Sequence, residues 1–453
     1  MSELEICFSE ALAYTASVTS GTYTTFRKHL DPVWIEEALA TTGTATLRRR
    51  RLPAEQVIWL VVGMALVRDR SIADVVRHLD LAMPSNDGQR TVASSAITQA
   101  RARLGSEPLE WLFERTASEW AHRSANDDRW RGLALYGLDG TTLRVPDSDE
   151  NRDYFGGQNG RWEGTSGYPL VRLVTVMALR SHLLAAACFG RYMGEAQYAK
   201  PLWDSIPERS LVLMDREYLD ASVFFELSSK HRHWVVPARS NTSWRVIETL
   251  GKDDLLVEME LSGASKMKHP DLPRHFDVRA IRYQRKGYPP RTLLTSLVDA
   301  KAYPADEIRR LFHERWEIEL GFGELKTEML QRLEAIRSRS PEMVKQELWG
   351  LLLAYNLVRL EIERVADETG VSPLRISFIA ALRLVIDEWN WSTVSTTPGA
   401  IPRHLTDLRD KIRVFVLPPR RHDRTFPRTV KIKMSNYDRK RPKAQSSSRR
   451  RPK

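Results

Sequence analysis

Two short runs of apolar residues, each ending near an aspartate, constrain the fold of this 453-residue chain more than any other feature. They are LALYGLDG (133–140) and LVLMD (211–215). Almost continuous apolar strands of this kind belong in a central sheet that is covered on both faces. We expect Asp139 and Asp215 to end these strands, where the chemistry of such sheets collects. Taken alone, each aspartate is explained equally well as the cap of the turn that follows it.

Further strands and a helix are predicted around these two runs. The segments 170–179, 182–190 and 233–238 have the length and composition of buried strands, and about 220–230 has the period of an amphipathic helix. We therefore predict an α/β fold, with a mixed sheet flanked by helices. Between about 239 and 290, alternating stretches such as FDVRAIRY and basic turns indicate strands that interrupt this core.

A third candidate carboxylate lies in the segment LFHERWEIELGFGELKTEM (311–329), which we predict to be one helix. At ~100° per residue, one stripe of this helix carries three charged side chains. Its members are Phe312, Arg315, Glu319, Phe322 and Lys326. The neighbouring stripe is apolar and has the period of a face packed on a core. In the simplest alternative, Arg315 and Glu319 form a solvated pair worth only ~0.2–0.5 kcal/mol.

Three carboxylates and two cations together suit a site that binds metal and phosphate. Asp139, Asp215 and Glu319 would supply the oxygen ligands that hard cations such as Mg2+ prefer. Two such ions stabilise both the attacking and the leaving oxygen at a phosphate. Arg315 and Lys326 would hold the flanking phosphates. We therefore predict a metal site at the three carboxylates, with Mg2+ as the cofactor and Mn2+ as its substitute.

The N-terminal part of the chain is predicted to be helical. Four helices are expected, at about 53–67, 71–79, 95–104 and 107–123. Gly105 is suited to end the third of these helices. The apolar residues of this helix fall on one face, and Gln99, Arg101 and Arg103 fall mostly on the other, as a DNA-reading helix requires. Structural helices also expose such side chains, so this pattern alone does not decide their role.

The C-terminal part is expected to be helical and then basic. Helices are predicted at about 341–366 and 373–389, followed by a linker rich in threonine and proline at 392–402. Residues 417–453 hold fourteen Lys and Arg against two Asp, which exceeds the net charge of +11 of the whole chain. We expect a disordered arm suited to non-specific contact with phosphates. A solubilising tail without a specific partner explains the charge equally well.

Composition excludes several classes of protein. The longest apolar run, 57–67, is far shorter than the ~20 residues that span a bilayer. The N-terminus, MSELEICFSE, lacks the basic and apolar regions of a signal peptide. The two cysteines, Cys7 and Cys188, show neither zinc-site spacing nor a disulfide framework. We expect a soluble intracellular protein with no membrane partner.

Several of these motifs resemble bacterial DDE transposases of the type-four insertion-sequence family, whose nuclease core is similar to ribonuclease H. AITQARARLG resembles part of the family's N-terminal domain, and LDGTTLRVPDSDEN and LVLMDREYLD resemble the surroundings of its two catalytic aspartates. HERWEIELGFGELK resembles its Tyr-Arg-Glu-Lys signature. The resemblance implies that Asp139, Asp215 and Glu319 are the catalytic triad, and that Arg315 and Lys326 contact DNA near the cleaved end.

The resemblance also concerns aromatic contacts to DNA. Phe312 stands where the signature has tyrosine, so it keeps a ring for stacking or packing but lacks the hydroxyl that bonds a phosphate. The resemblance implies a β-rich insertion that helps to handle the transposon end, in some members by receiving a flipped base on an aromatic residue. Trp244, Tyr283 and Tyr288 are candidates for this role. Each is also explained by packing within a sheet.

The expected organisation is a helical DNA-binding domain (1–128), a ribonuclease H-like core (129–335), a helical region (336–416) and the basic tail. The resemblance implies a transposase that binds the terminal inverted repeats of its element, cleaves the double-stranded DNA ends and transfers the 3′ hydroxyls to target DNA. A homodimer is expected in the DNA complex, and a cytoplasmic, nucleoid-associated location. Two alternatives remain: a metal-dependent nuclease without strand transfer, and a DNA-binding relative that has lost activity.

Overall fold

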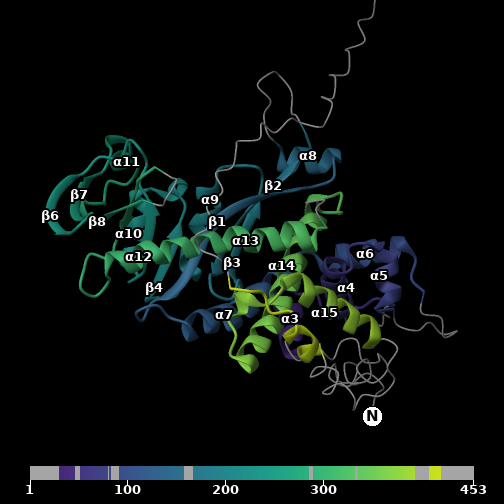
Figure 1. Ribbon diagram of the computed structural model, residues 1–453. Helices are drawn as coiled ribbons and strands as arrows, with labels where there is room; N and C mark the ends of the chain where they lie inside the picture. The colour runs from purple at the N-terminus through teal and green to yellow at the C-terminus, as the bar shows by residue number, and fades with distance from the viewer. Residues whose placement is uncertain are drawn as a thin grey trace, which may run out of the picture.

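A nine-stranded sheet runs through the molecule in the order β3-β2-β1-β4-β5-β9-β8-β7-β6 (Figure 1). This computed structural model describes residues 30–45, 51–79, 81–82, 91–157, 167–284, 289–331, 335–392 and 408–419. The strands are β1 (Ala134–Arg144), β2 (Leu170–Ala178), β3 (Leu184–Gly190), β4 (Ser210–Met214), β5 (His233–Pro237), β6 (Arg245–Gly251), β7 (Asp254–Glu260), β8 (His275–Tyr283) and β9 (Arg291–Thr295).

The first five strands form the ribonuclease H-like core that the sequence predicts. β1 pairs antiparallel with β2, and β2 with β3, whereas β1, β4 and β5 run parallel to one another. All five residues of β4 are buried, as are the first five of β1. The apolar character of these strands therefore follows from cover on both faces of the sheet.

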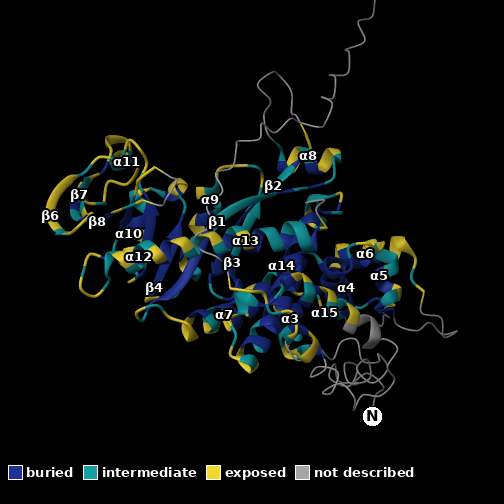
Figure 2. Ribbon diagram, in the orientation of Figure 1, coloured by how far each residue is buried: buried dark blue, intermediate teal, exposed yellow. Residues whose placement is uncertain are grey.

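The predicted insertion extends the same sheet. β9 pairs antiparallel with β5, and β8, β7 and β6 follow outward as antiparallel neighbours. The alternating stretches that predict strands here correspond to β7 and β8. Burial falls toward the outer edge, and β6 is almost entirely exposed (Figure 2).

The expected N-terminal helices are present, with ends within a few residues of the prediction. They are α4 (Ala54–Leu66), α5 (Ile72–His78), α6 (Ser94–Leu104) and α7 (Glu107–Asp127), preceded by α3 (Pro32–Thr41). Gly105 follows α6 with φ 69° and ψ −167°, a conformation that a residue with a Cβ rarely adopts. Its prediction as the end of this helix is confirmed.

One long C-terminal helix joins the two helical parts of the chain. α14 (Pro341–Thr369) packs against α4, α7 and α15 (Phe378–Ser392), and α7 also packs against β3. The N-terminal helices and the sheet thus share one continuous core. None of the helices in the described ranges is both long and apolar enough to cross a membrane. The predicted linker and basic tail lie almost wholly outside the described residues.

Short helical elements lie between the longer strands and helices. They are α8 (Asp149–Phe155), α9 (Glu195–Ala199), η1 (Lys200–Ser205), η2 (Arg216–Tyr218), α10 (Ala221–Ser229), α11 (Gly263–Lys268) and η5 (Pro373–Arg375). The helical segment from residue 305 to 329 crosses one face of the sheet (Figure 1). Ile318 of this segment packs closely on Gly137 of β1. If Gly137 had a Cβ, that atom would lie 3.5 Å from the Ile318 Cβ. This segment brings the third candidate carboxylate to the sheet.

Candidate active site

The strand register places Asp139 beside Asp215. β1 and β4 run parallel, and their pairing continues as far as Leu138 opposite Met214. The next residue of each segment is an aspartate. The two aspartates therefore lie at the same level on neighbouring parallel strands, whose axes are ~4.8 Å apart. The structure thus brings together two residues that are far apart in sequence.

Asp139 does not end its strand, so that part of the prediction is wrong. β1 continues to Arg144 because its residues stay paired with β2, with Asp139 opposite Thr175. Only the pairing with β4 stops before Asp139. Asp215 does follow the last residue of β4, and its Oδ1 accepts a hydrogen bond of 3.1 Å from the Glu217 amide. It therefore also caps the turn η2.

The surroundings of Asp139 disfavour its negative charge. Burial is the largest of the effects that raise the pKa of this carboxyl, and the Gly140 amide and the Arg315 guanidinium oppose it. The negative charges of Glu195 and Asp215 also raise it, and the net result is a pKa of about 7. A buried carboxylate with two like charges nearby is short of positive charge, and a cation at this position would favour its ionised form.

The segment that carries Glu319 is helical throughout, but it is not one α-helix as predicted. It comprises α12 (Ala305–Leu311), the 3-10 turn η3 (Phe312–Arg315), α13 (Trp316–Gly323) and the π-helical turn η4 (Glu324–Met329). The spacing of apolar residues does not distinguish these closely related helical bonding patterns. The predicted apolar stripe is confirmed, since Leu311, Ile318, Phe322, Leu325 and Met329 are all buried.

Arg315 links two of the three candidate carboxylates. Its Nη1 lies 3.4 Å from the Asp139 Oδ2, and its Nη2 donates to the Glu319 Oε1 at 2.8 Å. The predicted pair of Arg315 and Glu319 is therefore present, but it also joins the helix to β1. Lys326 points to the same strand and donates to the Thr141 Oγ1 at 3.4 Å. Both predicted cations thus contact the part of β1 that carries Asp139.

The donor set suits a hard divalent cation. Asp139, Asp215 and Glu319 offer carboxylate oxygens from two strands and one helix, the ligands that Mg2+ prefers. Within the described residues, no three His, Cys, Asp or Glu side chains are grouped closely enough to hold one ion. The Arg315 guanidinium instead supplies the positive charge between Asp139 and Glu319. The three carboxylates are therefore of the right chemical type to hold a metal ion. Their spacing in this structure is that of an ion-pair network around Arg315.

The structure corrects the prediction for Phe312. This ring is only 7% exposed and belongs to the hydrophobic core, so it is not available to stack on DNA in this arrangement. It meets the edge of the Tyr283 ring, with 6.3 Å between centroids. Of the two alternatives left by the missing hydroxyl, the structure shows packing. Tyr283 is half-buried in the same contact, Trp244 packs against the core, and Tyr288 lies outside the described residues.

The structure also corrects the prediction for Arg101, whereas Gln99 and Arg103 are exposed as expected. Arg101 is 5% exposed, and its Nε donates to the Gln346 Oε1 of α14 at 2.8 Å. This arginine lies four residues after the buried Ile97, on the side of α6 that faces the core. The sequence spacing already contained that signal.

One exposed aromatic residue beside the site is absent from the predicted set. Trp316 follows Arg315 directly and is 53% exposed, and Leu320, one turn later, is also partly exposed. Large apolar side chains on a surface are informative when they lie next to a candidate site. The sequence already indicated this exposure, because Trp316 falls outside the apolar stripe that packs on the core and also outside the charged stripe.

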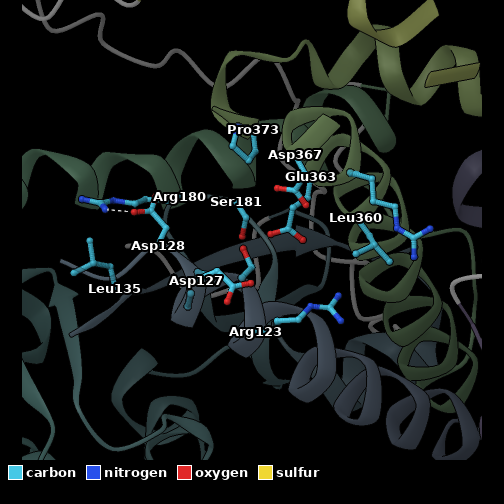
Figure 3. Close-up of a pocket in the computed structure, with 14 residues that line it drawn as sticks. Arg123, Asp127, Asp128, Leu135, Arg180, Ser181, Leu360, Glu363, Asp367 and Pro373 are labelled. Carbon is cyan, nitrogen blue, oxygen red and sulfur yellow. Dashed lines mark hydrogen bonds and ion pairs between the residues drawn. The ribbon is translucent and has the colours of Figure 1, made fainter. Parts of the chain in front are cut away.

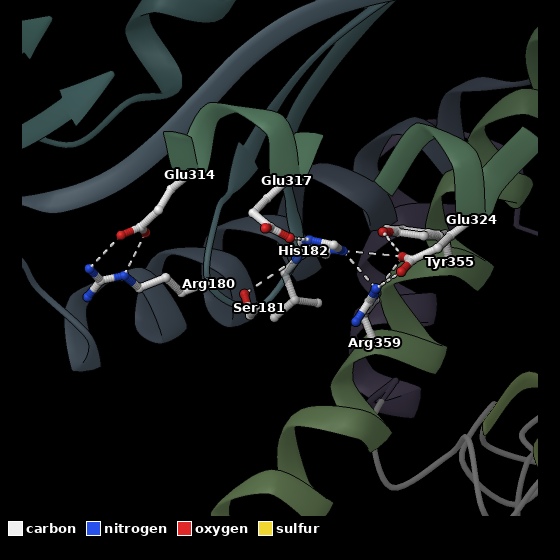
Figure 4. Close-up of polar contacts among 9 residues, drawn as sticks. Arg180, Ser181, His182, Glu314, Glu317, Glu324, Tyr355 and Arg359 are labelled. Atoms are coloured by element: carbon white, nitrogen blue, oxygen red, sulfur yellow. Dashed lines mark hydrogen bonds and ion pairs between the residues drawn. The ribbon is translucent and has the colours of Figure 1, made fainter. Parts of the chain in front are cut away.

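Ion pairs and hydrogen bonds attach the opposite face of the same segment to the rest of the protein (Figure 4). Glu314 pairs with Arg180 at 2.9 Å, and Glu317 lies 3.0 Å from the Nε2 of the buried His182. Glu324 is bonded to Arg359 of α14 and, at 2.9 Å, to the Tyr355 hydroxyl. Arg359 and His182 lower the pKa of Glu324 to about 2, although burial opposes them. Three carboxylates therefore anchor the segment behind Glu319.

A cavity of about 390 Å3 lies beyond this anchor, between α7, the turn after β2 and α14 (Figure 3). Charged side chains of both signs line it, among them Asp127, Arg180 and Glu363. Burial raises the pKa of Glu363. None of the three candidate catalytic carboxylates lines this cavity, so it is separate from the site at β1 and β4.

Comparisons with known proteins agree with this arrangement. Residues 20–114 match the family described as insertion element 4 transposase N-terminal, and residues 133–357 match the family described as transposase DDE domain. The second match includes Asp139, Asp215 and Glu319.

The chain is also similar to individual transposases. It is 39% identical over 427 residues to the transposase InsG for insertion sequence element IS4 of Escherichia coli (strain K12), covering 93% of this chain and 95% of InsG. It is 37% identical over 275 residues to the putative transposase InsZ of the same organism, covering 58% of this chain and 90% of InsZ. A cryo-EM structure of the piggyBac transposase synaptic complex with hairpin DNA aligns at a TM-score of 0.42 and 12% identity, over 90% of this chain and 87% of that one, a likeness too low to carry an argument.

Proposed function

The chain belongs to the IS4 family of insertion-sequence DDE transposases, and from this premise we propose that Asp139, Asp215 and Glu319 are its catalytic carboxylates. A transposase is an enzyme that cleaves and transfers DNA, and DDE domains use divalent metal ions for this chemistry. The observation that carries the proposal is the register of β1 and β4, together with the guanidinium that joins Asp139 to Glu319.

We propose that the enzyme binds the terminal inverted repeats of its element, cuts at the ends and joins the freed 3′ hydroxyls to target DNA. Water attacks the end phosphate first, and the bond from phosphorus to the 3′ oxygen breaks, which releases the 3′ hydroxyl of the element. This hydroxyl then attacks a phosphodiester of the target and displaces the 3′ oxygen of the target strand. No protein nucleophile takes part. Mg2+ held by the three carboxylates, with Mn2+ as a substitute, would stabilise the attacking and leaving oxygens when bound.

Other side chains of the site would hold the DNA. Arg315 and Lys326 face β1 and would contact phosphates near the cleaved end. The exposed Trp316 offers a ring on the same segment on which a base could stack. Gln99 and Arg103 project from the exposed side of α6 and would contact the terminal repeat. Because two element ends must be joined in one event, the active DNA complex is a homodimer. The enzyme acts on DNA of the nucleoid, in the cytoplasm.

The test is cleavage and joining of a labelled DNA that carries the element's own end, with Mg2+ present. Wild type should produce both nicked and joined products. Glu319→Gln should bind the DNA but lose both activities by ~100-fold or more. Glu328→Gln neutralises a carboxylate further along the same segment and serves as the matched control, with activity near wild type.

Each other outcome contradicts a defined part of the proposal. Nicked products without joined products would indicate a metal-dependent nuclease that does not transfer strands. Binding without cleavage, at any metal concentration, would indicate a DNA-binding relative without activity. Wild-type levels of cleavage and joining in Glu319→Gln would remove Glu319 from the catalytic set.

A further inference from the structure

The sheet sets the level of Asp139 and Asp215, but the direct pairing of their two strands does not reach either aspartate. The pairing of β1 and β4 ends at Leu138 and Met214, one residue before each aspartate. Beyond this point β1 continues beside β2 without further pairing to β4, and the other segment turns into η2. A catalytic pair must be held within about 0.5 Å of its working geometry, so another contact has to join the two segments.

The first residue of α9, Glu195, makes this contact. Its Oε1 accepts a hydrogen bond of 2.6 Å from the Nη1 of Arg172, which is paired with Thr142 on β1. Its Oε2 accepts a hydrogen bond of 3.3 Å from the hydroxyl of Tyr218, the last residue of η2. One carboxylate thus connects the antiparallel pair β1 and β2, which carries Asp139, with the turn that Asp215 caps.

The packing around Gly140 brings Glu195 close to the backbone of Asp139. A Cβ added at Gly140 would lie 2.4 Å from the Glu195 Cδ and 2.7 Å from its Oε2. Only a residue without a Cβ leaves room for this carboxylate against the strand. Tyr218 is 1% exposed, so its hydroxyl needs a hydrogen-bond partner, which Glu195 provides.

We propose that Glu195 is a positioning residue of the active site, which fixes the backbone after Asp139 against the backbone after Asp215 through Gly140 and Tyr218. It acts through its contacts and not as a ligand of the metal. This inference rests on the proposed function, because it concerns the spacing of the two proposed metal ligands. Residues that orient metal ligands in this way typically change metal affinity 10–100-fold when they are removed.

The experiment is calorimetric titration of the full-length protein with Mn2+, accompanied by thermal unfolding of each variant. Glu195→Ala removes both hydrogen bonds and should weaken Mn2+ binding by ~10–100-fold. Tyr218→Phe removes one of them and should weaken binding by a smaller factor. Glu195→Gln keeps an acceptor for Arg172 and a group that bonds the Tyr218 oxygen, so it should bind Mn2+ within ~2-fold of wild type. Glu226→Ala, which removes an exposed carboxylate paired with Lys230, is the control and should leave binding unchanged.

Two further variants distinguish a specific effect of Glu195 from a general loss of structure. Gly140→Ala should push Glu195 away and weaken Mn2+ binding, whereas the same change made in Glu195→Ala should add little. Independent effects of the two substitutions would overturn the proposal, because residues that act through one contact are not additive.

The remaining outcomes separate this inference from the proposed function. Wild-type affinity in Glu195→Ala would overturn the inference alone, provided that Asp139→Asn abolishes binding. Loss in Glu195→Gln as large as in Glu195→Ala would show that the charge and not the contacts of Glu195 matters, and would also overturn it. If wild type and Asp139→Asn bind Mn2+ equally, the proposed metal site is wrong and the inference falls with it.

Discussion

The two faces of the segment from α12 to η4 carry the same kinds of side chain and use them differently. On the face toward β1, Arg315 holds Glu319, and the Glu319 side chain is still 34% exposed. On the opposite face, Glu324 is bonded to Arg359 and Tyr355 and lies beside the buried His182. The first face keeps a carboxylate within reach of a ligand, whereas the second uses its carboxylates to attach the helix.

The difference shows what separates a catalytic carboxylate from a structural one. A buried ion pair is stable only when each oxygen has a partner, and Glu324 meets that condition within the protein. Glu319 has one strong partner and remains open to solvent. The anchored face also fixes the height of α13 above β1, which Glu319 requires if it is to meet the two aspartates.

The largest effect on stability is expected from Arg359→Ala. This change leaves the Glu324 carboxylate buried without its guanidinium, and should lower the free energy of unfolding by ~3–5 kcal/mol. Urea denaturation measures the loss. Arg413→Ala removes a partly exposed arginine paired with Glu368, and should cost at most ~1 kcal/mol. Equal losses in both variants would show that the pair of Arg359 and Glu324 holds the segment no more firmly than a partly exposed ion pair elsewhere in the protein.

On the active face, Arg315→Ala should mainly affect rate. The guanidinium lowers the pKa of Asp139, so its loss should raise that pKa above about 7 and leave less of the carboxylate ionised at neutral pH. DNA cleavage should fall by ~100–1,000-fold, as for the loss of one electrostatic contact in a site. Single-turnover cleavage measures this rate, and Arg310→Ala, on the exposed part of α12, is the control. A change in unfolding free energy above ~2 kcal/mol would place Arg315 among the anchors.

The pH dependence of stability tests the anchor at Glu324. The pKa of this group is about 2 in the folded protein and 4.5 ordinarily, so its contribution is complete above pH 4.5 and is lost as the pH falls toward 2. The difference in unfolding free energy between wild type and Glu324→Gln should therefore shrink by on the order of 3 kcal/mol between pH 5 and pH 2. Urea denaturation across this range measures it. A constant difference would mean that Glu324 is not held ionised by Arg359 and His182.

The smallest effect is expected from Glu319→Gln on stability. Its pair with Arg315 is partly exposed and spans four residues of one helical segment, so the loss should stay within ~0.5 kcal/mol. Thermal unfolding of the variant without DNA measures this. A loss of several kcal/mol would make Glu319 structural, like Glu324.

Much of the fold could be predicted because burial leaves a direct mark on local sequence. The apolar runs before Asp139 and Asp215 are strands covered on both faces, and Gly105 ends α6 because of its backbone conformation. The continuation of β1 beyond Asp139 could not be predicted in this way. It depends on pairing with β2, which starts at residue 170.

The candidate site was only partly predictable. Arg315 and Glu319 share a helix, so their spacing alone indicates a pair. The burial of Arg101 was indicated by its spacing from Ile97, but its partner Gln346 and the partner of Phe312, Tyr283, come from other segments and could not be predicted. The role proposed for Glu195 has no motif at all, because its contacts come from β1, β2 and η2.

The sequence by itself determined which residue types stand at which periodic positions, and hence the strands, the helices and the family signature around Glu319. Only the tertiary structure decided which of the glutamates between residues 314 and 324 are bonded to Arg180, His182 and Arg359 and which one faces Asp139. These glutamates are chemically identical, and local spacing does not distinguish them. Their roles differ because Arg180, His182 and Arg359 approach one face of the segment, whereas the strand edge with Asp139 lies on the other.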